Sequence, residues 1–151
     1  MDISMRQLTE IPRAEALSLL AGATLGRIVF TAHALPAVRL VSHIVEEAAI
    51  VIRSHYGAAI IRVRPEGDGG PRERAANDIV VAYEADEFDS DAGLGWSVAV
   101  TGTAALVRDP GDIARYERML PAWNKDGGIA GQFVRICPEI VTGYRFACGT
   151  G

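Results

Sequence analysis

The sequence has little cysteine and no long apolar run. Its two cysteines, Cys137 and Cys148, are too few for a disulfide framework, and their spacing fits no zinc motif. No apolar stretch reaches the length of a membrane span, and no basic region followed by an apolar core opens the chain. We therefore expect reduced thiols and a cytoplasmic protein with neither a signal peptide nor a membrane partner.

Strong charge of either sign is also missing. The chain carries 15 basic and 19 acidic residues, so its net charge is −4. This balance argues against a broad nucleic-acid surface. All the basic residues except Lys125 are arginines. A local anion site would therefore use guanidinium groups, which can bind a phosphate with two parallel hydrogen bonds.

The short motifs that mark many enzymes are absent as well. There is no Walker loop, no dinucleotide-binding glycine motif, no metalloprotease histidine pair and no serine nucleophile elbow. The three histidines, His33, His43 and His55, have no metal-ligand spacing, so no metal is expected. What remains is a chain of 151 residues, 49% of them hydrophobic, which suits a single domain over residues 1–151.

Short runs of β-branched and aromatic residues dominate this domain, and they predict an antiparallel meander. The expected strands cover residues 25–32, 37–45, 48–54, 78–85, 95–108, 133–137 and 140–146. Ala34-Leu35-Pro36 predicts a turn between the first two strands, and Glu46-Glu47 separates the second from the third. Gly102, inside the longest run, indicates a bulge or a sharp bend.

Two helices are expected beside these strands. The first opens at Pro12 and ends near Gly22, and the second has Asp109 as its N-cap and Pro110 at its first position. Residues 1–10 predict an extended or frayed lead-in, and residues 65–77 an exposed loop. The expected fold class is therefore mostly β with two helices, a small closed or partly closed barrel with mostly antiparallel strands.

Polar side chains interrupt the strands at a few positions where chemistry could reside. Arg39 and His43 are four residues apart on one strand, so their side chains leave the same face. Arg39 is either an anion ligand or a surface arginine, and His43 is either a titrating group or a barrel histidine bonded to backbone. Arg53 and Ser54 either meet an anion or mark the end of a strand.

Six phrases of the sequence, taken with the order of elements, resemble a known family. The phrases are LGRIVFT, PAVRLVSH, IVIRSHYG, VVAYEAD, GWSVAVTGTAALV and FVRICPEIVTGYRF. Together they resemble the pyridoxamine 5′-phosphate oxidase-like, FMN-binding split-barrel proteins, and within them the actinobacterial, nitroimidazole-reductase-like branch. The resemblance covers residues 11–146 and implies a split β-barrel that forms a homodimer, with FMN in a groove between the subunits.

The resemblance also implies roles for individual residues. It places Arg39 on the phosphate side of the flavin, Val41 and Ser42 beside the ring, and His43 near the ring as the catalytic residue. The other implied cofactor-binding residues are Arg53 and Ser54, which would line the ring and ribityl groove, and Trp96 and Ser97 from the long strand.

One departure from the family pattern concerns the phosphate. Family members commonly carry a hydroxyl and a basic residue where this chain has Ala58 and Ala59. Arg62, Arg64 or the 65–77 loop could replace those contacts. The first reading is a flavin-dependent oxidoreductase acting on a small molecule. The alternative is a non-catalytic dimer that binds a flavin, a deazaflavin or another small molecule, or no cofactor. A haem-binding barrel that uses His43 or His55 is a third reading.

Overall fold

The computed structural model describes residues 6–54, 79–120 and 132–148. The predicted 65–77 loop, Ala58 and Ala59 lie outside these ranges. The described elements, in chain order, are β1 (Arg6–Ile11), α1 (Arg13–Gly22), β2 (Leu25–Ala32), β3 (Leu35–Glu46), β4 (Ala49–Ser54), β5 (Ile79–Asp89), β6 (Leu94–Leu106), α4 (Pro110–Met119) and β7 (Gln132–Cys148).

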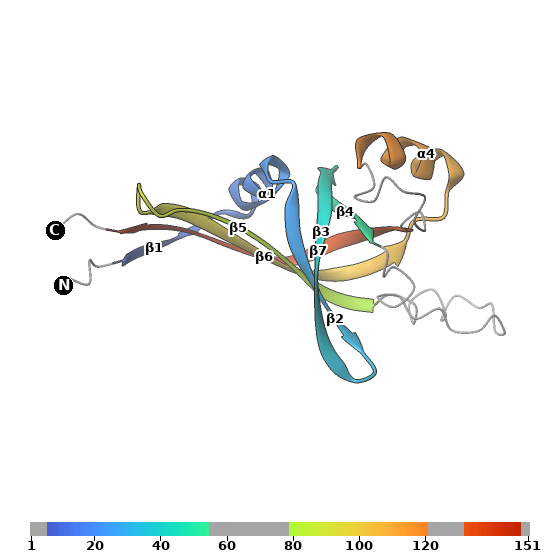
Figure 1. Ribbon diagram of the computed structural model, residues 1–151, viewed down its shortest axis with the longest axis horizontal. Coiled ribbons are helices and arrows are strands. Elements are labelled where there is room, and N and C mark those ends of the chain that lie inside the picture. The colour runs from blue at the N-terminus through green and yellow to red at the C-terminus, as the bar shows by residue number, and fades with distance from the viewer. Residues whose placement is uncertain (1–5, 55–78, 121–131, 149–151) are drawn as a thin grey trace.

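The strands form one antiparallel sheet in the order β1-β7-β4-β3-β2-β5-β6, and β6 also pairs with β7. This last pairing closes the strands into a barrel, so the predicted mostly β split-barrel architecture is confirmed. Figure 1 shows that β1, β5, β6 and β7 run together beyond the barrel at one end. We call this four-stranded extension the wing. No helix among the described residues is long and apolar enough to cross a membrane.

The main core lies inside the barrel, where alternate residues of the strands meet. It includes Ile28, Ile52, Val98 and Val100, all within 1% of complete burial. Helix α1 contributes Leu20 and covers one end of the barrel (Figure 1). Strand alternation therefore assigns each residue to an inner or an outer face of the sheet.

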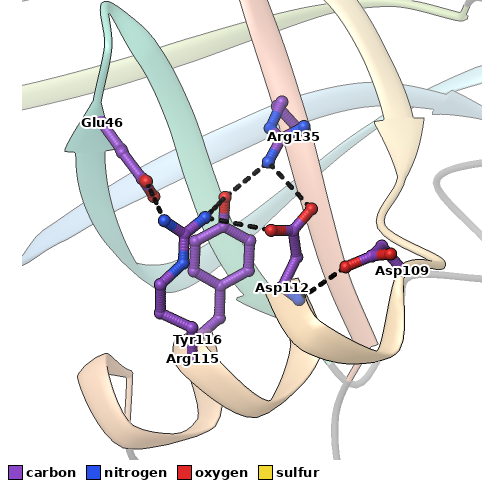
Figure 2. A network of polar contacts seen from close by, with 6 residues as sticks. All are labelled: Glu46, Asp109, Asp112, Arg115, Tyr116 and Arg135. Atoms are coloured by element: carbon purple, nitrogen blue, oxygen red, sulfur yellow. Dashed lines mark hydrogen bonds and ion pairs between the residues drawn. The ribbon is translucent and has the colours of Figure 1, made fainter.

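A second, smaller core lies on the outer face of β3, β4 and β7, under α4. It contains Val51, Tyr116 and Phe133. Figure 2 shows the polar contacts beside it: Arg115 bridges Glu46 and Asp112 at 2.6 and 3.1 Å, and Arg135 donates to the Tyr116 hydroxyl at 2.5 Å. These contacts fix α4 against β3 and β7.

The expected helix signals are confirmed. Helix α1 follows Pro12 directly, and α4 begins at Pro110, one residue after its N-cap. The Asp109 side chain accepts a hydrogen bond from the amide of Asp112 at 2.9 Å, as an N-cap does.

Two expectations about the strands were wrong in detail. The first hairpin turns at His33-Ala34, and Pro36 is already part of β3, opposite Thr31. Residues 132–148 form one continuous strand through Pro138, which the β6 bulge at Gly102 accommodates. Of the two alternatives for the lead-in, extended or frayed, the extended one holds for Arg6–Ile11, which forms strand β1 and pairs with the edge of β7.

Candidate functional site

Arg39 lies on the hairpin of β2 and β3. It pairs with Ile28 across the hairpin, so it leaves the same face as that core residue. The hairpin extends past the barrel body (Figure 1), and Arg39 is therefore exposed in the single chain. One of its terminal nitrogens donates to the backbone carbonyl of Val38 at 2.8 Å. Two residues on, Val41 is buried in the main core.

His43 lies deep inside the barrel, with 2% of its surface exposed. Its Nε2 is 2.8 Å from the carbonyl of Leu20 at the end of α1. A carbonyl can only accept, so Nε2 carries the proton and Nδ1 accepts a hydrogen bond from the Tyr83 hydroxyl. Burial lowers the pKa of His43 and raises the pKa of Tyr83. The imidazole is therefore held neutral, with both nitrogens hydrogen-bonded.

Tyr83 reaches His43 because Gly26 leaves room for it. A methyl group on Gly26 would lie 2.3 Å from the Tyr83 hydroxyl oxygen and 2.8 Å from the carbonyl of Glu84. Tyr83 was not predicted from the sequence, because the partnership depends on how β2, β3 and β5 align in the barrel. Tyr83 faces inward in the structure, and alternation along one strand gives no information on which inward residue of another strand lies opposite.

Arg53 and Ser42 lie together where β3 and β4 pair, and Ser54 follows Arg53 as the last residue of β4. Ser42 is the direct register partner of Arg53. One terminal nitrogen of Arg53 donates to the carbonyl of Leu120 at 2.6 Å, and the guanidinium lies 5.0 Å from the centre of the Phe133 ring. Its Nε is buried and has no hydrogen-bond partner among the described residues. Ser54 is buried, with 3% exposed.

Trp96 and Ser97 lie far from this group, at the start of β6 in the wing. Trp96 is buried on the inner face, and its indole nitrogen donates to Glu87 at 3.2 Å. Ser97 points to the outer face, since side chains alternate along a strand. Trp96 pairs with Arg145 near one end of β7, whereas Arg53 pairs with Phe133 near the other. The single chain therefore holds the predicted cofactor-binding residues in two separate groups.

Comparison with known proteins identifies the family. The family model described as pyridoxamine 5′-phosphate oxidase matches residues 12–145, which is most of the chain. The chain belongs to the pyridoxamine 5′-phosphate oxidase-like family. The resemblance seen in the six sequence phrases is thus confirmed.

Individual members of this family are similar over nearly the whole chain. The uncharacterised protein Rv0080 of Mycobacterium tuberculosis is 43% identical over 143 residues, which cover 94% of this chain and 88% of that protein. A solved Corynebacterium glutamicum structure, provisionally named pyridoxamine 5′-phosphate oxidase, is 30% identical with a TM-score of 0.69, covering 93% and 99% of the two chains. The FAD-binding protein of Mycobacterium smegmatis is 29% identical with a TM-score of 0.61, covering 92% and 98%.

A flavin bound by this fold would need donors for its phosphate and a surface for its ring. Arg53 fits the first need, because its buried Nε has no partner among the described residues. Ser42 lies opposite it on the adjoining strand β3 and adds a hydroxyl group, whereas the side chain of Ser54, the next residue of β4, leaves the other face of the sheet. The described part of the chain therefore suits the phosphate or ribityl end of a flavin, and family members of known structure include flavin-binding proteins.

Proposed function

We propose that this protein is an FMN-dependent oxidoreductase that passes a hydride from a reduced nicotinamide to a small electrophile. The observation that carries the proposal is the buried Nε of Arg53, which has no hydrogen-bond partner among the described residues, in a chain of this family where Ser42 lies opposite Arg53. A buried guanidinium N–H without an acceptor is costly unless a ligand supplies one. When bound, the flavin supplies the hydride chemistry, and the protein supplies binding and orientation.

The roles of the chain's own residues follow from their positions. Arg53 would hold the phosphate or ribityl end where β4 ends at Ser54, and the exposed Arg39 would close on the phosphate from the hairpin. Val41 and Ser42 would lie along the ring, as the family resemblance implies. His43 cannot donate a proton without breaking a bond to Leu20 or Tyr83, so in this proposal it positions β3 beside the ring.

A second copy of the chain would complete the site. A row of consecutive register partners crosses β3, β2, β5, β6 and β7, and its members are, in that order, Val38, Val29, Ala82, Thr101 and Ile140. They form a row on the outer face, where Val38 is 51% and Ile140 is 61% exposed. We call the sheet surface around this row the outer apolar face.

The same face carries most of the large hydrophobic side chains that the described residues expose. By strand alternation they are Leu8, Leu25, Val38, Leu40, Val80, Phe88 and Ile140. A monomer rarely exposes so many large apolar side chains on one face of its sheet, and this supports a homodimer. Ser97 lies on this face too, so Ser97 is proposed to reach the flavin held by the other subunit.

A non-catalytic flavin-binding or deazaflavin-binding dimer is the second candidate function. The position of His43 favours it, because the one predicted proton donor has both ring nitrogens engaged inside the core. The two candidates agree on binding and differ on turnover. Mixing the flavin-loaded protein with a reduced nicotinamide under anaerobic conditions separates them. Only the oxidoreductase should reduce its bound flavin, which is seen as a loss of flavin absorbance, as fast as it turns over.

Flavin binding itself is tested by titrating FMN against the purified protein and following the quenching of flavin fluorescence. Arg53→Ala should weaken binding about tenfold or more, because a charge-assisted hydrogen bond contributes ~1.5–3 kcal/mol. Arg39→Ala should weaken it as well. Arg118→Ala, which removes an exposed guanidinium from α4, is the matched control and should change nothing.

The outcome against the proposal is equally clear. If Arg53→Ala and Arg39→Ala bind FMN as the control does, the phosphate is held elsewhere or the chain holds no FMN. A repeat of the titration with FAD and with a deazaflavin then identifies the flavin that the site prefers.

A further inference from the structure

The wing contains a groove that the proposed flavin site does not use. The groove has a volume of about 650 Å³ and is lined by residues of β1, β5, β6 and β7. This volume is within the range of small-molecule sites, roughly 300–1,000 Å³. Most of its lining side chains, including Gln7, Thr9, Trp96 and Arg145, belong to the inner face by strand alternation.

This placement separates the groove from the proposed dimer contact. The outer apolar face and Ser97 lie on one side of β6, and Trp96 lies on the other. A second copy docked on the outer apolar face would cover Phe88 at the edge of the groove and would leave its inner-face lining, including Glu87 and Trp96, open to solvent. The groove also lies at the opposite end of β7 from Arg53.

The charges around the groove favour a cation. Glu87 and Asp89 contribute two carboxylates from β5. The one cation among the lining residues, Arg145, is already paired with Glu15 of α1, with its Nε 2.9 Å from the carboxylate. The local balance is therefore negative, which disfavours phosphates and carboxylates in this groove.

The remaining lining groups favour a cation that carries an aromatic ring. Trp96 provides an aromatic surface, and its indole N–H donates to the carboxylate of Glu87. The aromatic ring and the negative charge therefore lie next to each other. Leu94 adds apolar surface, and Gln7 and Thr9 add an amide and a hydroxyl. Aromatic side chains with nearby carboxylates are a common setting for organic ammonium ions.

We propose that the wing groove binds a small aromatic amine in its protonated form, separately from the flavin. Trp96 contacts the ring of the ligand, Glu87 pairs with its ammonium group, and Gln7 and Thr9 bond to its polar substituents. The proposal does not rest on the proposed function, because it uses none of the residues to which that function gives a role. Trp96, which the family resemblance implied as a cofactor-binding residue, is assigned here to the wing groove instead.

Isothermal titration of the full-length protein with tryptamine and with indole-3-acetate tests this proposal. The two probes share one ring system and carry opposite charges, so their difference reports the charge preference alone. Tryptamine should bind, and indole-3-acetate should bind more weakly by up to about fivefold, since one exposed ion pair contributes up to about that factor.

Two matched variants locate the binding. Glu87→Gln keeps an acceptor for the Trp96 indole and removes the charge, so it should weaken tryptamine about fivefold and leave indole-3-acetate unchanged or tighter. Glu117→Gln removes the same charge from the exposed face of α4 and should have no effect. A thermal melt of each variant shows that the fold is retained.

Three results would overturn the proposal. Tryptamine does not bind at millimolar concentration, or the two probes bind equally, or Glu87→Gln behaves as Glu117→Gln does. A fourth measurement distinguishes the groove from the flavin site. Saturating FMN should leave tryptamine binding unchanged, whereas displacement of tryptamine by FMN would show that the two ligands share one site and would refute a separate groove.

Discussion

At the scale of single residues, His43 shows how a sequence pattern can locate a residue without fixing its role. Its position four residues after Arg39 correctly placed both on one face of β3. The structure then gives His43 the backbone bond that the sequence left as one alternative, through the carbonyl of Leu20. Its catalytic role stays a prediction. In its place in the core, the imidazole joins α1, β3 and β5 through Leu20 and Tyr83.

The buried imidazole predicts a pH dependence of stability. Desolvation lowers the pKa of His43 in the folded chain below its ordinary value of 6.5, while the unfolded chain keeps that value. Below about pH 6.5 the unfolded state therefore binds a proton that the folded state does not, and stability falls as the pH decreases. The slope approaches about 1.4 kcal/mol per pH unit until the lowered pKa is reached.

Urea unfolding at pH 7.5, 6.5 and 5.5 measures this loss for the unmodified protein and for His43→Gln. The variant should be less stable at pH 7.5 and should lose less stability on acidification. His33→Gln, which changes an exposed histidine of the first hairpin, is the control and should follow the unmodified protein. Parallel pH profiles for the unmodified protein and His43→Gln would contradict the assignment.

At the scale of elements, the strands were predictable and the turns were not. Alternation located β2, β5 and β6 to within a few residues, because these strands bury one face more than the other. Strand β4 is buried on both faces, and its short β-branched run located it. Tight two-residue hairpin turns can normally be recognised in a sequence by Asn-Gly or Asp-Gly. Here the two turns consist of His33-Ala34 and Glu47-Ala48, and all four residues have positive φ. Neither pair is a known turn signal. The first turn was therefore predicted too far along the chain, at Pro36.

These two turns predict an unusual stabilising change. Ala34 and Ala48 have φ values of 62° and 63°, a left-handed conformation that costs a residue with a Cβ ~1–2 kcal/mol. Glycine removes that cost but gains freedom in the unfolded chain worth roughly 0.5–1 kcal/mol. Ala34→Gly and Ala48→Gly should therefore each raise the free energy of unfolding by about 0.5–1 kcal/mol, read from urea titrations.

The matched control is Ala37→Gly, in the regular part of β3. There the backbone needs no positive φ, so only the entropic loss remains and the free energy of unfolding should fall by about 0.5–1 kcal/mol. If Ala34→Gly is as harmful as Ala37→Gly, the first hairpin does not store strain at its turn.

At the scale of the whole molecule, the sequence predicted the site residues but not how one chain would distribute them. Strand alternation gives the face of each residue, whereas barrel closure through the β6–β7 pairing decides which strand ends come together. As a result Arg53 and Ser97 lie at opposite ends of the sheet. The family resemblance supplied what alternation could not, namely that a site between two copies could unite them.

The homodimer is the last prediction, and one substitution tests both assembly and function. Ile140 is 61% exposed at the end of the row Val38, Val29, Ala82 and Thr101. A glutamate there would place an unpaired charge in the proposed interface, which is strongly unfavourable once desolvated. The unmodified chain, of 16.1 kDa, should sediment as a dimer at micromolar concentration, and Ile140→Glu as a monomer.

Leu35→Glu is the matched control, because Leu35 is equally exposed, at 67%, but lies on the other face of the hairpin near its tip. It should remain dimeric and bind FMN normally. Ile140→Glu should lose FMN affinity together with the dimer, because Ser97 then no longer reaches the flavin held at Arg53 of the other copy. An unmodified chain that sediments as a monomer would refute the dimer, and a monomeric Ile140→Glu that still binds FMN fully would refute the shared site alone.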